Sequence, residues 1–170
     1  MLRHSFIFIL LFLLTAESYG QKTVNQFINE LKKNKTCLAV TLPGWMINSG
    51  TRIALKQMNE QDKSEIVALG KKIKQLRFIM IEDDLVVSKK EFLSAIRSMQ
   101  DKDQFEIYAN GRTKDGTLYV MVKEKKDTIK FLTMLYYDND MIAVVNIKSD
   151  LKISDLEAAN FSFNNPDFSF

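Results

Sequence analysis

Hydrophobic and polar residues alternate most regularly over the stretch 104–151, in four runs that turn residues separate. Successive side chains of a strand point to opposite faces, so each run is expected to form a strand with one apolar side. Asn110-Gly111, Asp115-Gly116 and Asp138-Asn139-Asp140 are typical of tight turns and predict an antiparallel four-strand meander. We expect its core-facing side to consist of Phe105, Ile107, Ala109, Leu118, Val120, Val122, Ile129, Phe131, Leu135, Tyr137, Met141, Ala143, Val145 and Ile147.

The opposite positions of these strands are apolar too, whereas a sheet covered on one side usually shows polar residues there. Something must therefore cover this outer side. One candidate is the end of the chain, where Phe161-Ser162-Phe163 and Phe168-Ser169-Phe170 supply four phenylalanines. The other is a partner: a second copy of the chain, another protein or an apolar ligand. The expected outer side consists of Tyr108, Tyr119, Met121, Leu132, Met134, Tyr136, Ile142 and Val144.

The rest of the chain contains helical periodicity and two further strand-like runs. Apolar residues spaced three and four apart predict helices, and Asp62 with Glu65 and Ser88 with Glu91 have the spacing of capping boxes. In chain order we expect a helix over 23–33, a strand over 38–42, a helix over 46–58, a helix after Asp62, a strand over 77–82, a helix from Ser88 and, after the meander, a short helix over 154–159 capped by Ser154.

Helices early and strands late indicate an α+β domain. The predicted fold is a largely antiparallel sheet of five to six strands that ends in the four-strand meander, with helices packed on one face. The two early strands would join the sheet beside the meander. The helical segment between them would allow them to run parallel to each other.

The first twenty residues have the pattern of a secretory signal peptide. A basic start at Arg3 precedes an apolar run over 6–14, and Ser18 and Gly20 are small residues at the −3 and −1 positions of a cut. The run is too short to span a bilayer comfortably. We expect cleavage after Gly20, one domain over 21–160 and an aromatic tail over 161–170. The mature protein would be periplasmic or secreted, with no integral membrane span.

The amino-acid composition limits the partners and the reactions that the mature protein could have. Cleavage removes one base, Arg3, and one acid, Glu17, so the net charge stays at +3, which is too mild to indicate a nucleic-acid partner. His4 lies in the signal peptide, so the mature chain lacks histidine and with it Ser-His and Cys-His catalysis and the commonest zinc ligand. Cys37 is alone, cannot form an intramolecular disulfide, and is expected to be a half-buried strand residue. Cys37 also lies well past the apolar run of the signal peptide, so it is not a lipid-attachment cysteine. We expect no cofactor.

Two acidic clusters have competing interpretations. Glu82, Asp83 and Asp84 end a predicted strand and could hold a hard cation through oxygen ligands, but consecutive residues point in different directions, which favours a solvated strand exit. The triplet at 138–140 is explained by a hairpin turn, since Asn and Asp tolerate its backbone geometry. We therefore predict no metal site.

Trp45 follows the breaker Pro43-Gly44 directly after a predicted strand. Such a tryptophan either lies at the rim of a groove and stacks on a ligand, or plugs the end of the core beneath the next helix. We favour the plug.

Two stretches carry a resemblance to a known family: Val40-Thr41-Leu42-Pro43-Gly44-Trp45 and the hairpin sequence over 110–123. With the signal peptide and the run over 141–150, the chain resembles domain-of-unknown-function family 4252. The family consists of small exported proteins of Bacteroidetes-type bacteria, many of them predicted lipoproteins. The resemblance implies location and fold and no activity. The chain departs from the lipoprotein members because it lacks the lipidation cysteine.

The sequence therefore predicts an exported, non-enzymatic binding domain of the cell envelope that acts through an aromatic and methionine-rich sheet face. Two alternatives stay open: a small metal-dependent or hydrolytic enzyme that uses the strand exit over 82–84, and a component of envelope-stress signalling. The predicted partner is an unknown protein, a second copy or an apolar ligand. The predicted binding residues are Trp45, Tyr108, Tyr119, Met121, Met134 and Tyr136.

Overall fold

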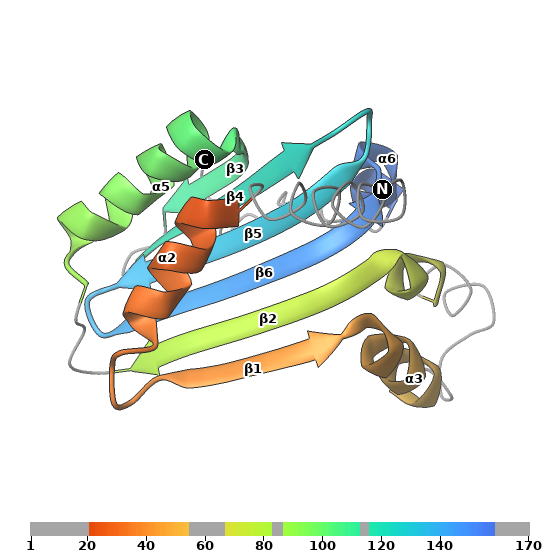
Figure 1. Ribbon diagram of the computed structural model, residues 1–170, viewed down its shortest axis with the longest axis horizontal. Helices are drawn as coiled ribbons and strands as arrows, with labels where there is room; N and C mark the ends of the chain where they lie inside the picture. Colours follow the sequence, from red (N-terminus) through yellow and green to blue (C-terminus); the bar gives the residue numbers. More distant parts are fainter. Residues whose placement is uncertain (1–20, 55–66, 83–86, 113–115, 159–170) are drawn as a thin grey trace, which may run out of the picture.

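One six-stranded antiparallel sheet organises the protein, with the strands in the order β1-β2-β6-β5-β4-β3 (Figure 1). This computed structural model describes residues 21–54, 67–82, 87–112 and 116–158. The elements are α2 (Lys22–Leu31), β1 (Leu38–Pro43), α3 (Gly44–Ala54), β2 (Ile73–Glu82), α5 (Lys89–Asp103), β3 (Glu106–Arg112), β4 (Gly116–Glu124), β5 (Ile129–Asp138), β6 (Met141–Leu151) and α6 (Ile153–Ala158).

The predicted α+β class and the four-strand meander are confirmed. Strands β3 to β6 are neighbours in chain order, β2 pairs with β6, and β1 pairs with β2. The suggestion that the two early strands run parallel is wrong, because β1 and β2 are antiparallel with Pro43 opposite Gln75. The chain leaves β1 and returns to β2 at the same end of the sheet, so the helical residues between them form an excursion at that end and no crossover.

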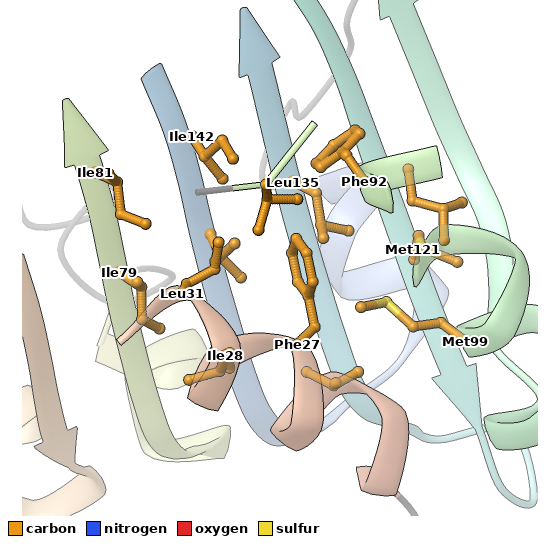
Figure 2. Close-up of a cluster of buried hydrophobic side chains, with 14 of the residues drawn as sticks. Phe27, Ile28, Leu31, Ile79, Ile81, Phe92, Met99, Met121, Leu135 and Ile142 are labelled. Carbon is orange, nitrogen blue, oxygen red and sulfur yellow. The ribbon is translucent and has the colours of Figure 1, made fainter. Parts of the chain in front are cut away.

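Helices α2 and α5 cover one side of the sheet, which we call the helix face (Figure 1). The buried residues of α2 include Val24, Phe27, Ile28 and Leu31, the spacing that places side chains on one face of a helix. Figure 2 shows Phe27, Ile28 and Leu31 of α2 and Phe92 and Met99 of α5 among side chains of β2, β4, β5 and β6. This layer is the main core.

The predicted capping box at the start of α5 is confirmed. The Ser88 hydroxyl accepts a hydrogen bond from the Glu91 backbone nitrogen at 3.3 Å, and the Glu91 carboxylate accepts from the Ser88 backbone nitrogen at 2.8 Å. The Glu91 carboxylate also accepts from the Ser88 hydroxyl at 2.7 Å, and this bond, followed by the one from the Ser88 backbone nitrogen, holds the pKa of Glu91 below its ordinary value. Two backbone donors at the helix start, the N–H groups of Ser88 and Glu91, are thus satisfied, which sets where α5 begins.

The opposite side of the sheet, which we call the far face, has its own smaller apolar cluster. Val120, Val122, Ile129, Leu132 and Leu151 are buried there. Leu69, in the helical residues 67–72, and Ile153, in α6, pack against them at one end. An ion pair between Lys72 and Asp155, 2.6 Å long, joins these two helical segments. Helix α6 begins at Ile153, so the predicted cap Ser154 lies inside the helix and the Asp155 carboxylate accepts from the Lys152 backbone nitrogen instead.

The predicted division of the meander into two sides is wrong. Val120 of β4 lies opposite Met134 of β5, and Tyr119 lies opposite Leu135, so the outer set predicted from the sequence combines residues of both faces. Alternation defines two faces within each strand, but the register set by the turn decides which faces join across strands. Both faces here are apolar, so hydrophobicity alone could not choose between the two registers.

Candidate binding surface

The six residues predicted to form a binding surface do not lie together. Tyr119 and Met121 belong to the helix face, where Met121 is 0% exposed and the Tyr119 ring lies 6.2 Å from that of Phe92. Met134 and Tyr136 are half-buried on the far face, because they lie opposite Val120 and Leu118. Burial beneath the helices removes Met121 from any surface that a partner could reach.

The other two predicted residues lie near opposite edges of the sheet. Tyr108 is 38% exposed at a bulge in β3, where Ile107 pairs with Met121 and Ala109 already pairs with Val120. Trp45 is 68% exposed in the first turn of α3. The interpretation of Trp45 as a core plug is therefore wrong.

Three cross-strand rows of apolar side chains run over the far face from β1 to β4. Directly opposed residues of neighbouring strands point to the same face, so the rows follow from the strand register. Within these rows every side chain is aliphatic, a methionine or an aromatic ring. The rows are Leu42, Leu76, Ile147, Leu132 and Val122; Val40, Phe78, Val145, Met134 and Val120; and Leu38, Met80, Ala143, Tyr136 and Leu118.

Exposure along these rows rises toward β1. Val120 and Leu132 are buried, Phe78 and Val145 are half-buried, and in β1 Leu38 is 49% and Val40 38% exposed. Strand β1 is the end of the sheet and has a strand partner on one side only among the described residues. Its residues Leu38–Pro43 include no charged side chain. No residue of this strand is among the predicted binding residues, although the absence of charge in it was a usable signal.

The exposed apolar side chains continue from β1 into α3. Leu38, Val40, Trp45 and Met46 are four of the exposed large hydrophobic residues of the described chain, and we call them the β1 patch. Gly44 permits the sharp passage from strand to helix, since a Cβ at this position would lie 2.6 Å from the Ile73 carbonyl oxygen. Helix α3, whose second residue is Trp45, thus follows β1 directly (Figure 1).

A polar cluster centred on Arg77 lies between α2 and the sheet. Arg77 Nη1 donates to Asn25 Oδ1 at 2.8 Å, and Nη2 donates to Gln21 Oε1 at 2.8 Å and to Asn146 Oδ1 at 2.6 Å. Asn146 in turn donates to the Thr133 hydroxyl at 2.8 Å. These acceptors are all neutral, and burial lowers the pKa of Arg77. The cluster attaches α2 to β2 and β6.

Carboxylates near the other end of the sheet are paired with lysines. Asp150 interacts with Lys130 at 2.7 Å and with Lys74, and the hydrogen bonds from these lysines lower its pKa. The Lys72 ammonium, followed by the Lys152 backbone, lowers the pKa of Asp155 in the same way. Asp150 and Asp155 are therefore explained as partners in structural ion pairs.

The described residues offer little to a metal or a nucleophilic reaction. No group of three or more His, Cys, Asp or Glu side chains within them is arranged to hold a metal ion. Glu82 is exposed at the end of β2, and Asp83 and Asp84 lie outside the described residues. Cys37 is half-buried against the core, as predicted, but it lies one residue before β1 and not in the strand, and desolvation raises its pKa. A raised pKa keeps the thiol protonated and unreactive.

Within the described residues, no helix has the length and apolar character that a membrane crossing needs.

Comparison with known proteins assigns the chain to a family. No curated protein and no solved structure matches the chain. Residues 28–159 match the family model described as "Domain of unknown function (DUF4252)", which covers well over half of the sequence and includes β1, Arg77 with its partner Asn146, and the whole meander. The chain therefore belongs to the DUF4252 family.

Proposed function

We propose that this protein is an exported, non-enzymatic binding domain of the bacterial cell envelope that docks an extended segment of a partner protein along β1. The observation that carries the proposal is the edge strand β1, whose side chains are exposed, uncharged and largely apolar. Exposed strand edges present unpaired N–H and C=O groups, and natural proteins usually protect them with lysine, bulges or a covering element. Strand β1 has none of these protections in the described chain, apart from Pro43 at its end.

Strand β3, at the opposite edge of the sheet, has the protections against strand pairing that β1 lacks. Strand β3 begins and ends with a charged residue, Glu106 and Arg112, and the bulge at Tyr108 interrupts its ladder. Helix α5 leads directly into β3 through Gln104, which has left-handed backbone angles. One edge is thus protected against strand addition and the other is open to it.

The chemistry of the surface indicates what kind of partner fits. A strand added to β1 would form main-chain hydrogen bonds with it, and alternate side chains of that strand would face the far-face rows beside Leu38 and Val40. Trp45 and Met46 lie where such a segment would continue past the end of β1. Tryptophan and methionine are enriched in the cores of interfaces. The expected partner segment is extended, with apolar residues at every second position.

The test compares two lysine substitutions at positions of equal exposure. Val40→Lys puts a charge on the open edge, whereas Tyr108→Lys, at a residue that is also 38% exposed, puts the same charge on the protected edge. We expect the wild-type protein and Tyr108→Lys to retain the same partner from envelope extracts and Val40→Lys to lose it. Equal capture by all three proteins contradicts the proposal. Light scattering with size-exclusion chromatography reveals whether the partner is a second copy, since Val40→Lys would then be monomeric.

The aromatic tail over 161–170 is the alternative occupant that the sequence offers for the same surface. It lies outside the described residues, and the chain reaches it from α6, whose Ile153 packs on the far face. If the tail covers apolar rows of that face, its deletion should raise both the binding of a hydrophobic dye and the amount of partner captured. Unchanged dye binding and capture would exclude the tail as a cover.

A further inference from the structure

Gln21 is the first described residue and also the predicted first residue of the mature chain. It occupies the position before α2, and although it is polar and adjacent to the predicted cut it is only 7% exposed. If the signal peptide is removed after Gly20, the new α-amine belongs to this buried residue. What happens at Gln21 does not depend on the binding function proposed above.

The two ends of the Gln21 amide have opposite surroundings. Its Oε1 accepts a hydrogen bond from Arg77 Nη2 at 2.8 Å. Its Nε2 is the one buried side-chain nitrogen or oxygen of the described residues that has no hydrogen-bond partner. Buried amide groups are almost always satisfied, so an unpaired one calls for an explanation.

The charges around Gln21 disfavour a free α-ammonium group. The Arg77 guanidinium donates to Gln21, Asn25 and Asn146, which are all neutral, so its hydrogen-bond partners within the described part of the chain do not balance its charge. The carboxylate at this end of α2 is Asp103, whose Oδ2 accepts from the Thr23 backbone nitrogen at 2.7 Å in a buried contact. An ammonium at residue 21 would compete with that bond or leave two cations on the same side of α2.

We propose that Gln21 is a modification site, converted to pyroglutamate once it becomes the N-terminus. The unprotonated α-amine nitrogen attacks Cδ and forms the new C–N bond of a five-membered ring. Negative charge develops on Oε1, where Arg77 donates, and this is where a cationic donor stabilises an acyl-transfer intermediate. The Cδ–Nε2 bond then breaks, and Nε2 leaves as ammonia with the proton that the attacking nitrogen loses.

Pyroglutamate would remove both the unpaired donor and the additional positive charge from the site. The unpaired Nε2 is the group that leaves, so the buried donor without a partner disappears. The lactam nitrogen is uncharged, which removes the second cation, and the lactam carbonyl oxygen remains as an acceptor for Arg77. The reaction needs no oxidant, reductant or added reactant.

The first experiment measures the mass of the protein exported from its full-length precursor. We expect the intact mass to be lower by one ammonia than that of residues 21–170, and the loss to reside in the N-terminal peptide that ends at Glu30. Gln21→Asn, which keeps an amide but whose α-amine could close only a four-membered ring, is the matched control and should not form the lactam. A full-mass wild-type protein, or a mature chain that begins at another residue, overturns the proposal.

The second experiment tests the role of Arg77. A folded chain in which a specific protease has just exposed Gln21 should lose ammonia several-fold faster than the Arg77→Met variant or the same chain held unfolded in urea. Arg97→Met, at an exposed arginine of α5, serves as the control and should match the wild-type rate. If Arg77→Met fails to fold, Arg77→Lys, which keeps the charge but not the planar donor geometry, should react at an intermediate rate. Equal rates in the folded variants and in urea overturn the assignment to Arg77.

Discussion

The two faces of the sheet have comparable apolar content and very different surroundings. On the helix face, Phe27 of α2 and Tyr137 of β5 both pack on Phe92 of α5, with ring centroids 6.1 and 5.0 Å away, and the layer is closed. On the far face the rows become steadily more exposed toward β1. The alternation within the strands is apolar on both faces and therefore does not predict which face is covered. Helices α2 and α5 cover the helix face, whereas no described helix extends over β1.

The polar residues of the strands make the contrast sharper. Arg77, Thr133 and Asn146 point to the helix face, which is the closed one, and the three far-face rows contain none of them. An ordinary two-layer sheet would show the reverse. Polar residues are tolerated beneath α2 because each finds a hydrogen-bond partner there, and the apolar far face is the side on which the proposed docking surface lies. Four substitutions test this comparison, from the largest expected effect to the smallest.

Truncation of the central ring of the helix face should be the most damaging. Phe92→Ala removes a buried side chain that contacts both α2 and the sheet, and we expect it to lower the free energy of unfolding by about 3–5 kcal/mol. Phe78→Ala, at a half-buried phenylalanine of the far face, is the control and should cost clearly less. Urea titration measures both, and equal losses would show that the two faces contribute alike.

Removal of an acceptor from the Arg77 cluster should rank second. Asn146→Ala leaves two of the guanidinium hydrogen bonds unmade beneath α2, at a cost of about 1–3 kcal/mol. Lys148→Ala, at an exposed residue farther along β6, should change stability by less than about 0.5 kcal/mol. If Asn146→Ala proves as neutral as its control, the cluster does not attach α2 to the sheet.

Loss of the α5 cap should weaken the cover of the helix face moderately. Ser88→Ala removes the acceptor for the Glu91 backbone nitrogen and should cost about 1 kcal/mol in thermal or chemical unfolding. Ser94→Ala, at an exposed serine within the same helix, should be neutral or slightly stabilising, since alanine is the better helix former. A cap variant no less stable than the Ser94 variant would contradict the argument.

The ion pair at the end of the far face should have the smallest effect and a specific pH dependence. The pKa of Asp155 is lowered in the folded state, so its contribution is present above the ordinary aspartate value of 3.8 and is lost as the pH falls through the lower folded value. Asp155→Asn should flatten this acid limb of the stability profile by less than about 1 kcal/mol, because the pair is partly exposed. Asp101→Asn is the control and should leave the acid limb as it is in the wild type. An acid limb that Asp155→Asn also leaves unchanged would show that the ion pair does not contribute to stability.

Local signals were predicted well from the sequence, and the candidate surface was predicted poorly. The apolar spacing in α2, the capping box of Ser88 and the turn over 138–140 depend on contacts within a few residues, and each is confirmed. The turn predicted at Asn110-Gly111 is wrong, because both residues pair with β4 inside β3. Of the six predicted binding residues, Trp45 alone belongs to the β1 patch. Tyr119 and Met121 were misplaced because the register between β4 and β5 is not encoded by the alternation in either strand.

By itself, the sequence determined which segments become helices and strands, where the α5 cap forms, and that every central strand would be apolar on two sides. Tertiary structure alone decided which side α2 and α5 cover, which strand is left at the edge, and that Arg77 meets Gln21, Asn25 and Asn146. The physical reason is the range of the interactions. Periodicity and capping act over one or two turns of chain, whereas strand order and helix placement depend on pairings between residues that are tens of positions apart.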